Sequence, residues 1–282
     1  MKNITPKVDL IFKKLFGVEE NKDLLISLIN SIINKEDQVE DVVILNPYNP
    51  QHCISGKLSI LDIKAKSTSG QRFNIEIQVS DEGDYDKRAL YYWAKLYTEQ
   101  LETSNDYSAL SKAIGIHILN FTSITTTDKY HNRFYMTERD TGVRYFKDIE
   151  LHTIELNKFE GNTKELTELV LKIKSTLDIW LAFLTKHNLL DKDNLPPELN
   201  DKNLKKALGV LDVMSLSNEE REVHDSRLNW LRIEASTLKK RYEEGRIEGK
   251  IEIARKMLLK KLSIDEISEI TGLTIKEIRK LV

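Results

Sequence analysis

Residues 60–79 read ILDIKAKSTSGQRFNIEIQV, and this stretch decides the fold. Apolar and polar residues alternate in 61–66 and again in 72–79, and a small polar turn with one glycine separates the two segments. Alternation with a period of two is typical of a strand with one buried face. The stretch therefore predicts a β-hairpin.

One face of the predicted hairpin is apolar, and the other carries the candidate chemistry. If the hairpin is symmetric about residue 69, Asp62 lies opposite Glu76, and Lys64 lies opposite Asn74. Two carboxylates directly opposite each other destabilise a hairpin by up to about 1 kcal/mol, and a divalent cation between them would remove that repulsion. Carboxylates suit Mg²⁺, which also takes water and substrate phosphate as ligands and can activate water.

The same residues have a simpler interpretation. Half-buried hairpins commonly expose one polar side to solvent, and one Asp and one Glu are ordinary there. The register is also an assumption, because a slip by one residue would change every cross-strand pair. Spacing alone thus leaves a metal site and a solvated face as open alternatives.

The rest of the chain predicts an α+β module followed by helices. Hydrophobic periodicity indicates two helices within 5–34, the first ending at Gly17, and one helix over 84–103. Strands are expected at 39–47, 113–121 and 149–156, with two further short strands, 132–136 and 142–146, between them. Long helices are expected at 162–188, 201–215 and 218–260.

The overall charge argues against a large basic surface. The chain has 282 residues, with 43 Lys and Arg against 45 Asp and Glu, and a formal net charge of −2. Nucleic acid could therefore bind only through a local patch. The single cysteine, Cys53, excludes an intramolecular disulfide and a multi-cysteine zinc site, which favours a cytoplasmic location. No apolar run approaches the roughly 20 residues of a membrane span.

The motif Asp62-x13-Glu76-x-Gln78 across the hairpin resembles that of the PD-(D/E)xK nucleases, with glutamine where the lysine usually stands. More specifically, the chain resembles the Rpn family of recombination-promoting nucleases, also called PD-(D/E)xK nuclease family transposases. The segments that carry this resemblance are Asp9 to Gly17 (DLIFKKLFG), Leu28 to Asn30, Asn74 to Gln78 and Lys87 to Trp93. The resemblance spans nearly the whole chain and is strongest over 5–121.

This resemblance implies a restriction-endonuclease-like fold, in which helices flank a central mixed sheet and a helical C-terminal region follows. It implies a divalent-metal-dependent DNA endonuclease linked to recombination or mobile elements. Asp62 and Glu76 would bind Mg²⁺, or Mn²⁺ or Ca²⁺ in its place, with the Ile77 carbonyl as a third ligand. DNA is the expected partner, a homodimer is one option for the assembly, and no membrane partner is expected.

The glutamine at position 78 departs from the wider superfamily. Glutamine can hydrogen-bond a water but supplies no charge, so a cation from elsewhere would replace the motif lysine. Lys64 on the same hairpin face and Arg88 on the following helix are the candidates, although each could be an ordinary surface charge. Asp9 would either reach the site from the first helix or be an ordinary acid near a helix start. Lys13 is interpreted more simply as a solvated lysine than as a phosphate contact.

The C-terminal segment predicts two short helices. Ser263 with Glu266 and Thr274 with Glu277 form two capping boxes, and Gly272 ends the first helix. The pair is similar to a helix-turn-helix, whose second helix would lie in a DNA major groove. Packing or dimerisation explains these helices at least equally well.

The sequence therefore predicts three regions and one leading function. The regions are a nuclease-like domain (1–157), a helical region (158–235) and a long helix with a small helix-turn-helix-like unit (236–282). Two other functions stay open. A catalytically silent protein on the same fold would bind DNA or assemble without cutting, and a nuclease could act on RNA, since the ion would act on a phosphodiester in either polymer.

Binding to DNA is predicted to be modest and sensitive to salt. Residues 1–80 hold ten basic and ten acidic residues, and a divalent ion at Asp62 and Glu76 would shift this balance from zero to +2. Contacts to phosphate release counterions, so they weaken as the salt concentration rises. We expect the dissociation constant for DNA to increase steadily in a salt titration, and an affinity that is independent of salt would contradict a charge-driven interface.

Overall fold

The computed structural model describes residues 4–48, 62–80, 83–101 and 106–281. Contacts divide the chain into two compact units, Met1–Arg227 and Leu228–Val282, and each is described by itself. The three regions expected from the sequence, with boundaries near 157 and 235, stay a prediction.

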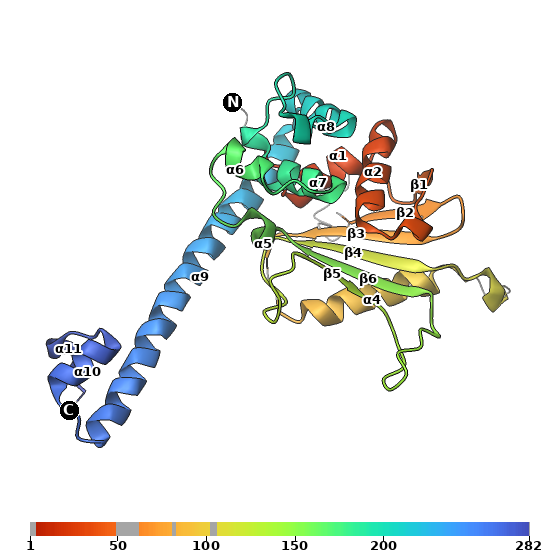
Figure 1. Cartoon of the computed structure of the whole chain (residues 1–282). Coiled ribbons are helices and arrows are strands. Elements are labelled where there is room, and N and C mark those ends of the chain that lie inside the picture. Colours follow the sequence, from red (N-terminus) through yellow and green to blue (C-terminus); the bar gives the residue numbers. More distant parts are fainter. Residues whose placement is uncertain (1–3, 49–61, 81–82, 102–105, 282) are drawn as a thin grey trace. The chain divides into compact units, whose positions relative to one another are not determined.

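A mixed sheet forms the centre of the first unit. In the described part of the chain it has six strands in the order β1-β2-β3-β4-β6-β5 (Figure 1). The strands are β1 (Val42–Ile44), β2 (Ile63–Ser67), β3 (Arg72–Gln78), β4 (Ala113–Leu119), β5 (His131–Phe134) and β6 (Ile149–Glu155). The first three strands are antiparallel, β3, β4 and β6 run parallel, and β5 is antiparallel to β6.

The register of the β2–β3 hairpin is the predicted one. Ile63–Lys66 pairs with Arg72–Ile75 in an antiparallel ladder, with Lys64 opposite Asn74. Asp62 directly precedes the first paired residue of β2, and Glu76 directly follows the last paired residue of β3. The register therefore sets these two residues level with each other at one end of the hairpin.

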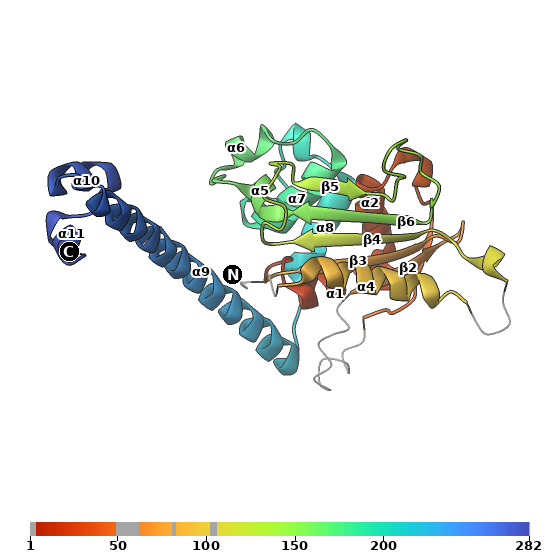
Figure 2. The ribbon, with the colours of Figure 1, turned by 90° about the horizontal axis from the view of Figure 1, so that it is seen from below.

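The polar face of the hairpin is covered by a helix. The helix α4 (Tyr85–Thr98) packs against β3 and β4 on this face (Figure 2). Asn74 is consequently only 2% exposed, and the side chain of Glu76 is 16% exposed. An ordinary solvated face is therefore not what the structure shows for these two residues.

A layer of helices packs on the opposite face of the sheet. It consists of α1 (Asp9–Phe16), α2 (Lys22–Ile32), α7 (Thr176–Lys186) and α8 (Lys202–Val213), which contact one another (Figure 1). The rings of Phe12, Phe16 and Trp180 form a continuous contact in this core, with centroids 4.7 Å and 5.3 Å apart. This arrangement confirms the expected α+β fold, in which helices flank a central mixed sheet.

Gly17 ends α1, as predicted, because of a close backbone approach. Its N–H donates to the carbonyl of Lys13 at 2.7 Å. A Cβ atom at Gly17 would lie 2.6 Å from that same oxygen, closer than real Cβ atoms come. A larger residue could not close the helix here without a shift of the backbone.

Two local expectations are wrong. Segment 142–146 does not form a strand, and its apolar side chains Val143, Tyr145 and Phe146 are exposed, so they face no core. The helix expected over 162–188 is broken into α6 (Leu166–Val170) and α7, because Ser175 accepts the N–H of Asp178 and so caps a new helix start. The shorter helix α5 (Leu156–Glu160) precedes them, and 3₁₀ turns occur at Glu19–Asn21, Lys35–Asp37, Tyr107–Ala109, His187–Leu189 and Pro197–Leu199.

The second unit contains two small helices that close on the end of a long one. The long helix α9 (Asn218–Leu259) is followed by α10 (Ile264–Thr271) and α11 (Ile275–Arg279). Ala254, Ile267, Leu273 and Ile278 form their common core. Both predicted capping boxes are present, and Gly272 adopts the left-handed φ of 66° that ends α10. No helix within the described ranges has the length and apolar character needed to span a bilayer.

A charged network is buried in the first unit. Glu150 and His152 on β6 are both fully buried and share a hydrogen bond of 2.8 Å, and Lys112 lies 2.6 Å from Glu150. Burial alone would raise the pKa of Glu150, but the bonds from His152 and Lys112 outweigh it and hold the pKa at about 2. His131 lies 2.9 Å from His152, and its burial, with the neighbouring His152, lowers the pKa of His131 to about 3.

The neutral His131 predicts a loss of stability in weak acid. In the unfolded chain His131 takes up a proton near pH 6.5, whereas in the folded chain it resists protonation to about pH 3. The contribution of His131 to the free energy of unfolding is complete above pH 6.5. It decreases as the pH falls, by at most about 2 kcal/mol between pH 6.5 and 5. Glu150 loses its contribution only below its unfolded pKa of 4.5. Urea unfolding at each pH should show a shallower decline for His131→Gln, and equal slopes for both proteins would exclude this cause.

Candidate functional site

Asp62 is held in place by a side chain that follows β1. The side-chain amide of Asn46 donates to the backbone carbonyl of Asp62 at 3.1 Å and to its carboxylate at 3.4 Å. The Asn46 Oδ1 atom accepts the backbone N–H of Lys64 at 2.7 Å. Asn46 thus fixes the backbone on both sides of Ile63, at the start of β2, together with the direction of the Asp62 carboxylate.

Lys13 of α1 contacts the backbone of the same residue. It is only 2% exposed, and its Nζ atom donates to the carbonyl of Asn46 at 2.6 Å and to the carbonyl of Asp62. Burial lowers the pKa of Lys13 to about 8, although the nearby Asp62 charge acts in the opposite direction. Burial also raises the pKa of Asp62, against the charges of Lys13 and Lys64. The interpretation of Lys13 as a solvated lysine is therefore wrong.

Glu76 has its own partners on the α4 face. Arg88 of α4 places its Nη2 atom 3.3 Å from Glu76 Oε1, and His117 of β4 places Nδ1 3.9 Å from Oε2. His117 shares a hydrogen bond of 2.7 Å with the hydroxyl of Tyr85. Burial lowers the pKa of His117 to about 4, so this ring is neutral near pH 7. The carboxylate of Glu76 thus lies between a cation and a neutral buried imidazole.

The other predicted site residues have various contacts. Lys64 donates to Glu99 near the end of α4 at 2.8 Å, and its charge also acts on Asp62. The amide of Gln78 donates to the carbonyl of Ser80 at 3.2 Å. Ile77 has an aliphatic, buried side chain without ligand atoms, so its backbone carbonyl is the group that could serve as a metal ligand.

Asp9 takes part in a contact between α1 and the first residues of α9. Its carboxylate lies 3.1 Å from Arg227, and burial raises its pKa despite this ion pair. The adjacent Lys14 pairs with Glu220 at 2.7 Å, and the Tyr48 hydroxyl also donates to Glu220. The structure therefore brings Arg88 to Glu76 and Lys64 close to Asp62, and it directs Asp9 toward α9.

Comparison with known proteins identifies the family. A family model described as PD-(D/E)XK nuclease family transposase matches residues 6–241. The chain belongs to this family. Neither the curated proteins nor the solved structures contain a match to it.

Membership in the PD-(D/E)XK nuclease family transposases supports a nuclease linked to mobile elements. The match covers the hairpin, α4 and the part of α1 that carries Lys13. No group of three or more His, Cys, Asp or Glu side chains in the described ranges is arranged to hold a metal ion.

Sequence reasoning missed several residues of this family member's site. Asn46 and His117 gave no signal, because their roles arise from strands that are distant in sequence. Lys13 did give a signal, because it lies four residues after Asp9 and three residues before Phe16 and therefore shares one side of the helix with them. A lysine on an apolar stripe predicts a buried stem, and the surrounding carbonyls determine where its ammonium group lies.

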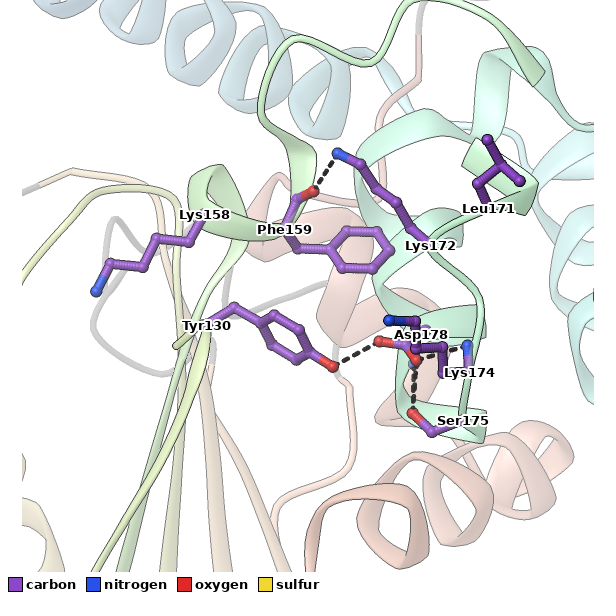
Figure 3. A pocket seen from close by; sticks show the side chains of 8 residues that line it. All are labelled: Tyr130, Lys158, Phe159, Leu171, Lys172, Lys174, Ser175 and Asp178. Carbon is purple, nitrogen blue, oxygen red and sulfur yellow. Dashed lines mark hydrogen bonds between the residues drawn. The ribbon is translucent and has the colours of Figure 1, made fainter. Parts of the chain in front are cut away.

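The chain also has a cavity at the start of α7, and none of the predicted site residues lines it. Its volume is about 410 Å³, and its lining residues are Tyr130, Lys158, Phe159, Leu171, Lys172, Lys174, Ser175 and Asp178 (Figure 3). Asp178 accepts the Tyr130 hydroxyl at 2.6 Å, and Lys172 donates to the carbonyl of Phe159 at 2.9 Å. Bonds within the protein occupy these polar groups, so we assign the cavity no role in the reaction.

Proposed function

We propose that this chain is a divalent-metal-dependent DNA endonuclease that hydrolyses phosphodiester bonds in recombination or in the movement of mobile elements. The observation that carries the proposal is the register of β2 and β3. It sets Asp62 level with Glu76 at one end of a hairpin, within a chain that belongs to a nuclease family.

The residues at this end of the hairpin fit a hard divalent cation. Mg²⁺ usually takes one or two carboxylates and completes its shell with water and substrate phosphate. Asp62 and Glu76, with the Ile77 carbonyl, would supply such a partial shell for Mg²⁺, Mn²⁺ or Ca²⁺. When bound, the ion would activate water and offset the negative charge that develops during cleavage.

The protein's own groups would orient and support this chemistry. Asn46 holds the Asp62 carboxylate, and Arg88 holds the Glu76 carboxylate at 3.3 Å. Fixed outer partners of this kind orient metal ligands and tune their basicity. The side chain of Gln78 donates to the Ser80 carbonyl, and its Oε1 atom can accept a hydrogen bond from the attacking water. We propose direct attack by water, with no covalent intermediate on the enzyme.

Cleavage of supercoiled plasmid tests the assignment of the ligands. Wild type should cut with Mg²⁺ or Mn²⁺ and not with EDTA. Loss of a residue that only supports a metal ligand lowers metal affinity or activity by about 10–100-fold. Asp62 is proposed as a direct ligand, so Asp62→Ala should reduce the cleavage rate by at least about 100-fold. Glu198→Ala, at an exposed position outside the hairpin, is the matched control and should cut like wild type. Equal cleavage by wild type and Asp62→Ala would sink the assignment.

Thermal unfolding tests the metal site without any substrate. A ligand at 100 times its dissociation constant stabilises the folded state by about 2.7 kcal/mol. Mn²⁺ should therefore raise the Tm of wild type by about 5–10 °C. Asp62→Asn and Glu76→Gln keep the side-chain shapes but remove one charge each, so both should lose most of the shift. A full shift in both variants would place the ion elsewhere.

Two further assays with the wild-type chain distinguish the two other functions. A catalytically silent DNA-binding or assembly protein would retain DNA in a filter assay and leave the plasmid intact with every metal. A nuclease for RNA would cut a structured RNA faster than a DNA of the same sequence.

A further inference from the structure

Among the described residues, Lys13, Lys64 and Arg88 are cations that act on Asp62 or Glu76, and they differ in how their charge is balanced. Lys64 forms an ion pair with Glu99 at 2.8 Å, and Arg88 forms one with Glu76 at 3.3 Å. Lys13 differs, because its hydrogen-bond acceptors in the described part of the chain are two backbone carbonyls, which carry no net charge. Of these three cations, Lys13 is therefore the one whose positive charge is balanced least by a carboxylate in direct contact.

The position of Lys13 also makes its charge effective. Between charges exposed to water, the interaction is largely screened beyond a Debye length, whereas the interactions of buried charges are screened much less. Lys13 is 2% exposed, and the side chain of Lys64 is 24% exposed. Two hydrogen bonds fix the ammonium group, so little reorganisation is needed when charge develops nearby.

We propose that Lys13 supplies the fixed positive charge that the glutamine at position 78 does not, and that it acts as a positioning residue beside Asp62. This inference rests on the proposed function and names the cation of that same site. Lys13 comes from α1, on the opposite side of the hairpin from α4. Its field would favour an anionic phosphate at the end of the hairpin and the negative charge that grows there during cleavage.

The alternative is a purely mechanical role, in which Lys13 only ties α1 to the strand ends at Asn46 and Asp62. The two roles predict opposite effects on metal binding. Asn46 holds the carbonyl and the carboxylate of Asp62 through hydrogen bonds that do not involve Lys13, so a neutral substitution at Lys13 leaves them in place. Removal of a fixed positive charge should then leave the metal affinity unchanged or increase it. Loss of a mechanical tie would instead decrease the affinity.

The experiment compares Lys13→Met and Lys13→Gln with Lys13→Arg, with Lys35→Met as the matched control. Lys35 is exposed and lies outside the hairpin, so this variant should behave like wild type. Calorimetric titration with Mn²⁺ should give the neutral variants a dissociation constant equal to or lower than that of wild type. In plasmid cleavage their kcat should fall at least 100-fold, and Lys13→Arg should stay within tenfold of wild type. Asn46→Leu should show the contrasting result, with metal affinity reduced about 10–100-fold.

Three results would overturn the inference. One is a kcat within threefold of wild type for both neutral variants. Another is a tenfold loss of Mn²⁺ affinity in both. The third is a Lys13→Arg variant as inactive as Lys13→Met at equal Tm. A wild type that binds Mn²⁺ without cutting any nucleic acid would refute the proposed function, whereas a tenfold loss of Mn²⁺ affinity in both neutral variants would overturn the inference on Lys13 alone.

Discussion

The pairing register of β2 and β3 is the constraint on which the rest of the structure depends. A slip by one residue would turn Ile63 and Ile75, both fully buried, toward the opposite face of the sheet. The slip would also turn polar side chains such as Lys64 and Asn74 into the apolar core, and the cost of burying them there without partners fixes the register. The positions of Asp62 and Glu76 then follow without any attraction between the two carboxylates. Packing of the core thus determines the geometry of the candidate site.

The site lies where the two helical layers meet the end of the hairpin. The α1 layer brings Lys13 to Asp62, and α4 brings Arg88 to Glu76 on the other face. Arg88 pairs with the Glu76 carboxylate itself, whereas Lys13 donates to the backbone carbonyl of Asp62 and acts on the Asp62 carboxylate only through its charge. The two helices thus join both layers of the fold to the same end of the hairpin. Small movements of either helix would change the field at the site.

The sequence was sufficient for the features that depend on local pattern. Alternation predicted the hairpin, the assumed symmetry about residue 69 gave the observed register, Gly17 marked a helix end, and both C-terminal capping boxes formed. It was insufficient where a residue's surroundings come from distant segments. Alternation shows that Asn74 lies opposite the apolar face, but only the packing of α4 makes it buried. The contacts of Asn46 and His117 arise in the same way. The chemical roles of the site residues remain proposals.

The contact between α1 and the first residues of α9 determines where the first unit can be shortened. Asp9 faces Arg227, and Lys14 faces Glu220, which also accepts the Tyr48 hydroxyl. A fragment that stops in the loop before α9 would leave the largely buried carboxylate of Asp9, on the helix that carries Lys13, without its partner Arg227. We therefore expect a fragment that extends through Arg227 to be more stable than one that stops before α9. Proteolytic nicking that leaves this fragment whole would have to fall beyond it.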